Sequence, residues 1–233
     1  MSDLGFSTAI EAQHRRIDRS NYRNVYVVGD VHGCRGALDA LLAKLDPAAE
    51  DLVVLVGDLV RRGPDSAGVI ERVRSTPNVV SIRGNNEEKI VHGRRQLPEL
   101  SVADVRWLRS RPLVLSWEGT VVVHGGIDPR EPRDALTVDD LQNTESVAAD
   151  GDGPPYWWER YDGPERVFFG HEVLERPLVG ASAVGLDTGC VYGGRLTAYD
   201  CARDRTVSVA APRAHRERAP EKFLSPDRYP AVS

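Results

Sequence analysis

Long hydrophobic runs, paired cysteines and an excess of basic charge are all missing from this sequence of 233 residues. No window approaches the roughly 18 consecutive apolar residues of a membrane-spanning helix, and the N-terminus has no apolar signal-peptide core, so no membrane association is expected. The 3 cysteines have no C-x-x-C spacing, which argues against a disulfide framework or thiolate zinc site and favours the cytoplasm. The net charge of −5 provides no basic field for duplex nucleic acid.

Two common catalytic signatures are also absent. There is no G-x-x-x-x-G-K-[ST] phosphate loop, and the segment HEVLE lacks the second histidine of a zinc protease. With 41% hydrophobic and 28% charged residues, the chain can still bury a substantial core. Any anionic ligand must therefore be held by local positive charge.

The first half of the chain predicts three successive strand–loop–helix units. Apolar runs at 25–28, 52–56 and 79–83 have the near-continuous hydrophobic character of strands covered on both faces. The polar residues that close these runs recur at intervals of 28 and 27 positions, close to the length of one βαβ unit. The three strands are therefore expected to be parallel neighbours in one sheet. Helices are predicted at 35–45, 64–73 and 101–110.

The second half changes character and predicts a more antiparallel sheet. Its expected strands are 113–117, 120–123, 167–169 and 183–186, followed by a hairpin within 195–209. The intervening segment 128–165 is predicted to be mostly loop, with one short helix near 137–141. The predicted domains are an N-terminal extension over 1–24, a single domain over 25–210 and a loosely held C-terminal tail over 211–233.

Five predicted strands end in the same way, with glycine and a side chain that can bind a metal. The segments are VVGDVHG, VLVGDLVRRG, SIRGNNE, VVVHGGIDP and VFFGHE. In open α/β sheets, ligands bind at the carboxyl ends of strands, where glycine lets the backbone approach closely. One aspartate or histidine at such a place is usually a turn former or a hydrogen-bonded core residue. The recurrence instead predicts a shared site made by Asp30, His32, Asp58, Asn85, His124 and His171.

The chemistry of this set indicates two divalent cations. Carboxylate, imidazole and amide ligands suit manganese, with iron or zinc as alternatives, and no thiolate is present to favour structural zinc. Two such ions beside two aspartates would leave a net charge of about +2, which favours a phosphate dianion. A water that bridges two ions becomes a hydroxide nucleophile, while both metals hold phosphoryl oxygens for in-line attack. Arginines in the turns VRRGP and IRGNN would add charge-assisted contacts to the transferred group.

In the order GDxHG, GDxxxRG, GN, HGG and GH, these motifs resemble the calcineurin-like metallophosphoesterases, within the group of phosphoprotein phosphatases and diadenosine tetraphosphatases. The likeness covers residues 25–200 and ends in LDTGCVYGGRLTAYD. It implies an α/β fold with α+β elements, a four-layer α/β/β/α sandwich with two central mixed sheets. It also implies that Arg62 contacts phosphate and that Asp58 bridges the two metals. The first metal would be completed by Asp30 and His32, and the second by Asn85, His124 and His171.

Two positions depart from the family's pattern. Asn86 stands where the histidine of a GNH motif is expected, and Arg61 stands where an assisting aspartate is expected. An amide cannot titrate, and losing a general acid costs roughly 10²–10⁴ in rate when the leaving group needs a proton. A serine alkoxide needs one, whereas a nucleotide phosphate leaves as a stable anion that Arg61 could stabilise. The predicted function is hydrolysis of nucleotide polyphosphates, as in bis(5'-nucleosyl)-tetraphosphatases, with Arg61, Arg62 and Asn86 as catalytic residues.

Arg160 is a further candidate for phosphate binding, because the family often carries arginine-rich sequence near the segment YWWERYDGPER. Trp157 and Trp158 could stack on a nucleobase or pack inside the fold. Cys34 is predicted to be a small packing residue or an oxidation-sensitive bystander. Two other functions stay open. One is a serine/threonine phosphoprotein phosphatase in which Asn86 hydrogen-bonds the leaving oxygen, and the other is a phosphate sensor that binds metal without catalysis.

Overall fold

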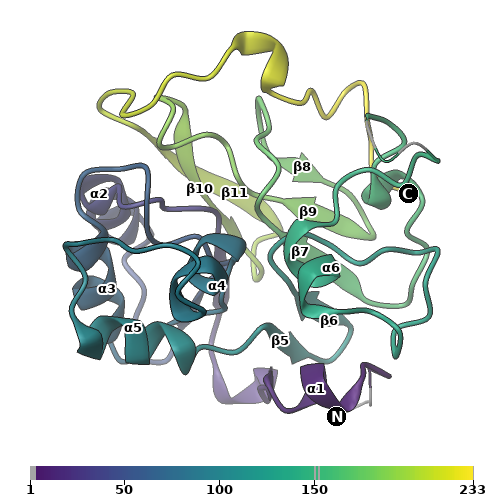
Figure 1. Cartoon of the computed structure of the whole chain (residues 1–233), viewed down its shortest axis with the longest axis horizontal. Helices are drawn as coiled ribbons and strands as arrows, with labels where there is room; N and C mark the ends of the chain where they lie inside the picture. The colour runs from purple at the N-terminus through teal and green to yellow at the C-terminus, as the bar shows by residue number, and fades with distance from the viewer. Residues whose placement is uncertain (1–3, 150, 152, 233) are drawn as a thin grey trace.

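The computed structural model describes residues 4–149, 151 and 153–232. Two β-sheets form its centre, and Figure 1 shows α2, α3, α4 and α5 gathered on the side of one of them. Both sheets combine parallel and antiparallel pairings, so the predicted α/β architecture with two central mixed sheets is confirmed. Within the described part of the chain, no helix is both long and apolar enough to cross a membrane.

The five-stranded sheet has the strand order β11-β10-β2-β3-β4. Its strands are β2 (Val25–Val28), β3 (Leu52–Leu55), β4 (Val79–Ser81), β10 (Arg195–Asp200) and β11 (Arg205–Ala210). The parallel part of this sheet contains the three strands predicted from the regularly spaced apolar runs, and every residue of these strands is buried. Because β2, β3 and β4 are parallel, their carboxyl ends meet at one edge of the sheet.

The six-stranded sheet has the strand order β1-β5-β6-β7-β9-β8. Its strands are β1 (His14–Arg16), β5 (Val114–Trp117), β6 (Thr120–Val122), β7 (Arg166–Phe169), β8 (Leu178–Val179) and β9 (Ala183–Gly185). The prediction of a more antiparallel second sheet is wrong, because β1, β6 and β7 each take part in a parallel pairing. The hairpin β10–β11 joins the first sheet instead, through antiparallel pairing with β2. Hydrophobic alternation identifies strands, whereas contacts between distant segments choose their partners.

The two sheets pack face to face. Their shared layer combines Val27 and Val54 of the first sheet with Leu115, Val122 and Phe168 of the second. The outer face of the five-stranded sheet is covered by α2 (Arg35–Leu45), α3 (Ser66–Arg74), α4 (Asn85–Val91) and α5 (Val102–Arg109). The outer face of the six-stranded sheet is covered by α1 (Thr8–Glu11), α6 (Val138–Asn143) and the aromatic residues of a short 3₁₀ helix, η2 (Trp157–Glu159). Two further 3₁₀ helices are η1 (Arg19–Asn21) and η3 (Pro220–Lys222).

The helix α2 illustrates how sequence pattern becomes packing. It occupies the residues predicted, and its leucines at 38, 41 and 42 point into one core cluster, as expected for a 3.6-residue period. Cys34, the residue before the helix, is 4% exposed and belongs to the same cluster, which confirms its packing role. The helix ends at Leu45, and the next residue, Asp46, adopts the left-handed conformation common at helix C-termini.

Both predicted terminal segments take part in the fold. Within the predicted N-terminal extension, β1 pairs parallel with β5 at the edge of the six-stranded sheet. In the C-terminal segment, Leu224 forms a β-bridge with Leu174, and the carbonyl of Tyr229 accepts a hydrogen bond at 2.9 Å from the indole Nε1 of Trp158. The expectation of a loosely held tail is therefore wrong for the described residues of this segment, because specific contacts anchor it.

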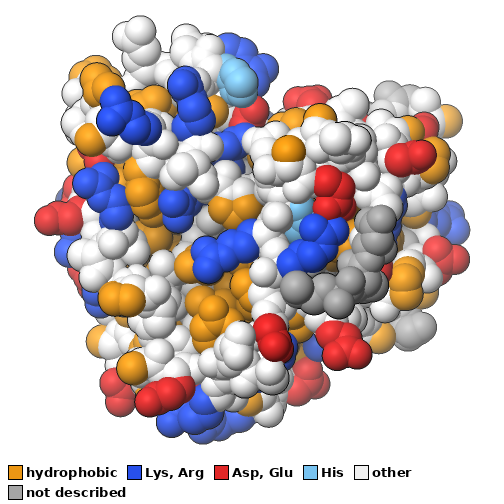
Figure 2. Space-filling view, turned by 90° about the horizontal axis from the view of Figure 1, so that it is seen from below, with side chains coloured by type: hydrophobic (Ala, Val, Ile, Leu, Met, Phe, Trp, Pro, Cys, Tyr) orange, Lys and Arg blue, Asp and Glu red, His pale blue; other side chains and the backbone are white. Residues whose placement is uncertain are grey.

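Basic side chains are distributed over the surface in small groups. Figure 2 shows such groups on the face seen from below, interspersed with hydrophobic, uncharged and acidic side chains. This distribution agrees with the net charge of −5. Charge that holds an anion must come from particular arginines and lysines around a site.

Candidate metal centre

Three predicted metal ligands follow β2 and β3, at the edge where the carboxyl ends of the strands meet. Asp30 and His32 lie just after β2, and Asp58 lies just after β3. Each offers a ligand atom, and these atoms all lie within 4.8 Å of one another. His32 Nε2 is 3.8 Å from Asp30 Oδ2 and 3.6 Å from Asp58 Oδ2. All three side chains are buried, so this cluster has little surface in contact with solvent.

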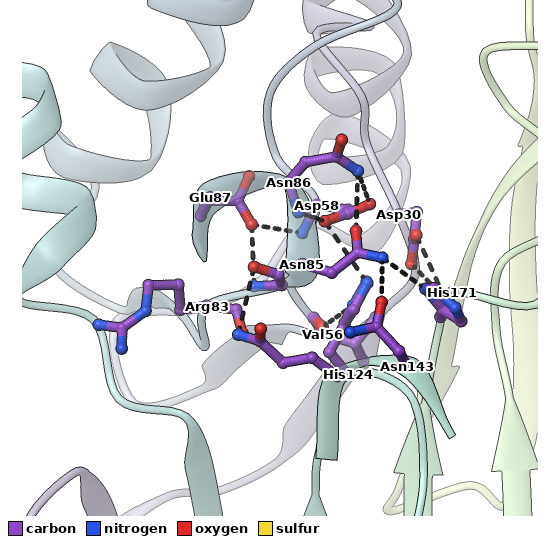
Figure 3. A network of polar contacts seen from close by, with 12 residues as sticks. Asp30, Val56, Asp58, Arg83, Asn85, Asn86, Glu87, His124, Asn143 and His171 are labelled. Atoms are coloured by element: carbon purple, nitrogen blue, oxygen red, sulfur yellow. Dashed lines mark hydrogen bonds and ion pairs between the residues drawn. The ribbon is translucent and has the colours of Figure 1, made fainter. Parts of the chain in front are cut away.

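Asn85, His124 and His171 lie close to Asp58 and Asp30 in Figure 3, and the N–H of His171 donates to the carboxylate of Asp30 at 3.3 Å. Asn85 is the first residue of α4, His124 follows β6, and His171 follows β7. His124 Nε2 lies 3.4 Å from Asp58 Oδ1, and the centroids of the two imidazole rings are 5.2 Å apart. His171 Nδ1 lies 3.2 Å from the amide nitrogen of Asn85. The structure thus brings the six predicted ligands together around the carboxylates of Asp30 and Asp58.

Each imidazole is held through one ring nitrogen and presents the other to the cluster. His124 Nδ1 lies 2.9 Å from the carbonyl of Val56, and His32 Nδ1 lies 3.3 Å from a main-chain carbonyl. His171 Nε2 lies 2.7 Å from the carboxylate of Glu145. Among the described residues, the buried Nε2 of His124 has no hydrogen-bond partner. Metal-binding histidines typically use their second nitrogen in this way, so the rings fit cation binding.

The backbone at this edge adopts an unusual conformation. The φ angles of His32, Asp58 and His171 are 48°, 49° and 66°, in the left-handed region that residues other than glycine seldom occupy. Such conformations persist where surrounding contacts enforce them, and they cluster at functional sites. Three of the six candidate ligands therefore share a backbone feature that residue type alone does not reveal.

Two glycines make room for the carboxylates. A Cβ atom on Gly170 would lie 1.9 Å from Asp30 Oδ1, and a Cβ atom on Gly84 would lie 2.4 Å from Asp58 Oδ1. Any side chain at these positions would displace a candidate ligand. Glycine is therefore required at these two strand ends, because a side chain there would collide with a carboxylate.

Burial and mutual charge control protonation in the cluster. Burial raises the pKa of Asp30 well above its usual value, and the nearby Asp187 adds to this rise. Burial lowers the pKa of His32 to about 4. Burial disfavours both charges of the pair Asp58 and His124, but their attraction outweighs it, lowering the pKa of Asp58 and raising the pKa of His124 to about 10. The cluster therefore retains an anionic carboxylate and a proton that a bound cation would replace.

Asn86 connects the candidate ligands to Arg61. Arg61 Nη1 donates to Asn86 Oδ1 at 2.6 Å, which orients the amide so that its Nδ2 donates to Asp58 and, at 3.0 Å, to Asn85 Oδ1. The backbone N–H of Asn86 also donates to Asp58 Oδ1, at 2.9 Å. The two departures from the family's pattern are thus direct partners of each other. An amide does not titrate and a guanidinium keeps its proton, so this pair supplies hydrogen bonds and positive charge.

Glu87 is a buried carboxylate that the sequence interpretation did not single out. It accepts backbone N–H groups from Asp58 at 2.8 Å, Gly84 at 2.9 Å and Val60 at 3.2 Å. Burial raises the pKa of Glu87 to about 7, and the charge of Asp58 contributes to the rise. Glu87 therefore ties the loop after β3 to the start of α4. Its signal in the sequence is the position three residues after Gly84, as in a capping box.

Asp187 is a second buried carboxylate that sequence reasoning missed. It follows β9, its Oδ1 accepts the N–H of Gly189 at 2.9 Å, and its Oδ2 has no partner among the described residues. Burial raises the pKa of Asp187 to about 7. A buried oxygen without a partner is costly and needs a local reason. The segment VGLD closes an apolar run with an aspartate, which is the same signal that marks the other strand ends.

A cavity of about 530 Å³ adjoins the cluster. Three cationic side chains line it together with candidate metal ligands and acidic groups: Arg62, Arg218, Lys222, His32, Asp58, Asn85, His171, Glu145 and Glu172. The guanidinium of Arg62 donates through Nη1 to the hydroxyl of Tyr192. The structure therefore brings Arg62 to the cavity beside the candidate metal ligands.

A second group at the cavity consists of Glu145, His171 and Glu172, with ligand atoms within 4.8 Å of one another. Burial raises the pKa of Glu172 to about 8, and the neighbouring Glu145 adds to the rise. Glu172 therefore binds a proton more readily than an exposed glutamate does. The carboxylate of Glu145 lies 2.7 Å from Nε2 of His171 and orients its ring.

Arg160 and the paired tryptophans lie elsewhere. Arg160 is exposed and lines a different pocket, so the structure does not bring it to the candidate metal ligands. Trp157 and Trp158 are 0% and 1% exposed, with ring centroids 4.9 and 5.2 Å from that of Phe169. Their packing role is confirmed, and burial excludes them from stacking on a nucleobase. The arginine that reaches the cavity is Arg218, from a segment in which the sequence shows no strand or helix pattern.

Comparisons with known proteins point to one family. The family model described as calcineurin-like phosphoesterase matches residues 23–180. The symmetrical bis(5'-nucleosyl)-tetraphosphatase of Janthinobacterium sp. (strain Marseille) is 27% identical, over 80% of this chain and 96% of that relative. Serine/threonine-protein phosphatase 1 of Salmonella typhimurium is 30% identical, over 80% of this chain and 96% of that relative. A solved structure described as a "putative diadenosine tetraphosphatase" has a TM-score of 0.76 and 28% identity, covering 85% of this chain and 98% of the other.

Proposed function

The chain belongs to the calcineurin-like phosphoesterases and hydrolyses phosphoric esters or anhydrides, and we propose that its substrates are nucleotide polyphosphates cleaved at a phosphoanhydride bond. The relatives named above act, by their names, on dinucleoside tetraphosphates or on phosphoproteins. The choice between these two substrate classes depends on whether the enzyme can protonate the leaving group. The residues around Asn86 support dinucleoside tetraphosphates.

The family's dinuclear centre fits the six clustered side chains. We assign Asp30, His32 and Asp58 to one cation, and Asp58, Asn85, His124 and His171 to the other. Two divalent cations bound there would supply an activated water and positive charge at the phosphoryl oxygens. Manganese is the proposed metal, with iron or zinc as alternatives, because the donors are carboxylate, imidazole and amide oxygen without thiolate.

The observation that carries the proposal is the hydrogen bond between Arg61 and Asn86. Arg61 Nη1 lies 2.6 Å from Asn86 Oδ1, and the amide nitrogen of Asn86 faces Asp58. This pair offers no proton to a leaving alkoxide, but it places a guanidinium beside the candidate metal ligands. Phosphoanhydride cleavage releases a phosphate anion that needs positive charge more than a proton. Arg62, at the cavity wall, would hold the transferred phosphoryl group.

A second candidate function is serine/threonine phosphoprotein phosphatase. It is supported by the 30% identity to the Salmonella relative of that name. In that case Asn86 would hydrogen-bond the leaving oxygen without protonating it. Phosphorylated small molecules are further possible substrates. Their activated esters, like nucleotide polyphosphates, release a stable anion that needs no proton. The cytoplasm is the proposed compartment, because the 3 cysteines lack the spacing of a disulfide framework.

The test compares kcat/KM for a dinucleoside tetraphosphate and a phosphoserine peptide, with Mn²⁺ present. We expect the tetraphosphate to be preferred by roughly 10² or more, because only the peptide's leaving group needs a proton. Asp58→Asn is the control, expected to lose metal stoichiometry and roughly 10³ in activity. Clear preference for the peptide would establish the phosphatase alternative. Metal binding without turnover of either substrate, or of nitrophenyl phosphate, would indicate a sensor.

A further inference from the structure

The C-terminal segment 214–224 is fixed beside the cavity at both of its ends. At one end, Ala214 forms a β-bridge with Tyr192, and the N–H of His215 donates to the carbonyl of Val191 at 2.8 Å. At the other end, the N–H of Leu224 donates to the carbonyl of Val173 at 2.9 Å, and Val173 lies two residues after a candidate metal ligand. The segment therefore runs from the loop after β9 to the loop after β7, across the top of the view in Figure 1.

Two cationic side chains of this segment line the same cavity as the candidate metal ligands. These are Arg218 and Lys222, which share the cavity wall with Arg62. Arg218 packs over the rings of Tyr192 and Phe223, with its Cζ 5.4 and 5.8 Å from their centroids. Arg62 packs against the same Tyr192 ring at 5.6 Å. The ring of Tyr192 thus contacts Arg62 of the VRRGP turn and Arg218 of the C-terminal segment at a common wall.

The guanidinium of Arg218 is pre-positioned but keeps donors available. Its Nε and Nη2 donate to the carbonyl of Lys222 at 3.1 and 2.8 Å. Its Nη1 has no hydrogen-bond partner among the described residues. The acidic groups on this side of the cavity are Glu145 and Glu172, and the first of these is already paired with His171 at 2.7 Å. Arg62, Arg218 and Lys222 thus outnumber these two acidic groups, and Arg218 keeps a free donor for an anion.

We propose that Arg218 and Lys222 form a distal anion subsite that binds the phosphates of a polyphosphate chain beyond the one under attack. A single phosphoryl group is already served by Arg62 and the metal cluster, so two further cations from a separate segment suit an extended anion. Arg160, the sequence-based candidate for a second phosphate contact, lines a different pocket. The inference rests on the proposed function, whose substrate class it makes more specific.

The test measures inhibition of nitrophenyl phosphate hydrolysis by inorganic tripolyphosphate and by orthophosphate, with free Mn²⁺ held constant. The readout is the ratio of the two inhibition constants, orthophosphate over tripolyphosphate. Arg218→Ala is expected to lower this ratio roughly tenfold by removing a charge-assisted contact, and Lys222→Ala to lower it several-fold. Lys222→Ala keeps the carbonyl that accepts from Arg218, so it separates phosphate binding from anchoring of the segment.

Arg216→Ala is the matched control, because Arg216 is an exposed arginine of the same segment that does not line the cavity. Its ratio should equal that of the wild type. If both cavity variants keep the wild-type ratio, or if the control changes it equally, the subsite is wrong. A wild-type enzyme that prefers the phosphoserine peptide would refute the proposed function, whereas the ratio would still decide whether the segment binds an extended anion.

Discussion

The amino end of the five-stranded sheet and the carboxyl-end site that both sheets share use buried polar side chains in opposite ways. At the amino ends of β2 and β3, each buried polar group has partners: Asp51 accepts from Arg23 at 2.9 and 2.7 Å, and Asn24 Nδ2 donates to Asp200 Oδ1 at 2.7 Å. At the carboxyl ends, the described residues include two buried atoms without a hydrogen-bond partner, His124 Nε2 after β6 and Asp187 Oδ2 after β9 of the six-stranded sheet. The amino end is thus complete by itself, and the shared carboxyl-end site is not.

This difference separates groups that stabilise the fold from groups that bind a ligand. A paired buried polar group contributes to stability, whereas an unpaired one costs free energy until something pairs with it. The carboxyl end also contains the residues with φ near 50°, His32 and Asp58, which adds conformational strain. Substitutions at the carboxyl end should therefore remove activity without unfolding the protein, and those at the amino end should do the reverse.

The largest expected effect follows from Asp30→Asn at the carboxyl end. Loss of one carboxylate ligand should reduce metal stoichiometry and lower kcat/KM by roughly 10³. After chelation of metal, the variant should melt higher than the wild type at neutral pH. The reason is that burial and the nearby Asp187 raise the pKa of Asp30, so the ionised carboxyl group destabilises the fold.

The difference in stability between Asp30→Asn and the wild type should depend on pH. A carboxyl group with a raised folded pKa destabilises the protein increasingly as pH rises above its unfolded pKa of about 3.9. The stability advantage of Asp30→Asn should therefore be largest near neutral pH and shrink towards pH 4. A chelated variant that melts below the wild type at every pH would contradict the view that this end of the sheet is destabilising.

The next effect concerns the pair at Asn86 and Arg61. Restoring a proton donor with Asn86→His and Arg61→Asp together should raise kcat on a poor leaving group, such as a phosphoserine peptide, by roughly 10². Hydrolysis of a dinucleoside tetraphosphate should change less, because its leaving group needs no proton. Each single variant serves as a control and should give little gain, since the two residues are direct partners at 2.6 Å. Equal gains on both substrates would argue against a missing acid.

The carboxyl end was largely predictable from sequence because its signal is local. Glycine followed by Asp or His after an apolar run identified candidate ligands such as Asp58 and His171, and parallel strands then had to bring them to one edge. The roles of Glu87 and Arg218 were not predictable in the same way. Glu87 acts through three backbone N–H groups whose positions depend on tertiary structure. Arg218 reaches the cavity only because a patternless segment is anchored at both ends.

In the fold, too, features set by local sequence were predictable, whereas pairings between distant segments were not. Hydrophobic pattern predicted every strand of the five-stranded sheet but missed β1 and β8 of the other, and the helix predicted at 35–45 has those bounds in the structure. The hairpin at 195–209 was identified but assigned to the wrong sheet, because its partner β2 lies about 170 residues earlier in the chain. Pairing over such distances is decided by packing of the whole core, which single-sequence periodicity does not contain.

A smaller effect distinguishes the two arginines proposed from sequence for phosphate binding. Arg62→Ala should lower kcat/KM for nitrophenyl phosphate by roughly tenfold to a hundredfold, because Arg62 lines the cavity beside Asp58. Arg160→Ala should leave it within about twofold, because Arg160 is exposed at a different pocket. Equal losses in the two variants would mean that the cavity extends to Arg160 in the working enzyme. Metal content should match the wild type in both cases.

Asp51→Asn at the amino end should have the smallest effect on activity. It should nevertheless lower the stability of the protein measurably. The variant should keep kcat/KM and metal content but melt roughly 2–5 °C lower, because the side chain loses charge-assisted hydrogen bonds from Arg23. Those bonds lower the pKa of Asp51, so its contribution is present above the unfolded pKa and is lost as pH falls through the folded pKa. The difference in melting temperature should therefore narrow in acid. Lost activity with unchanged melting would show that the two ends of the sheet are not functionally distinct.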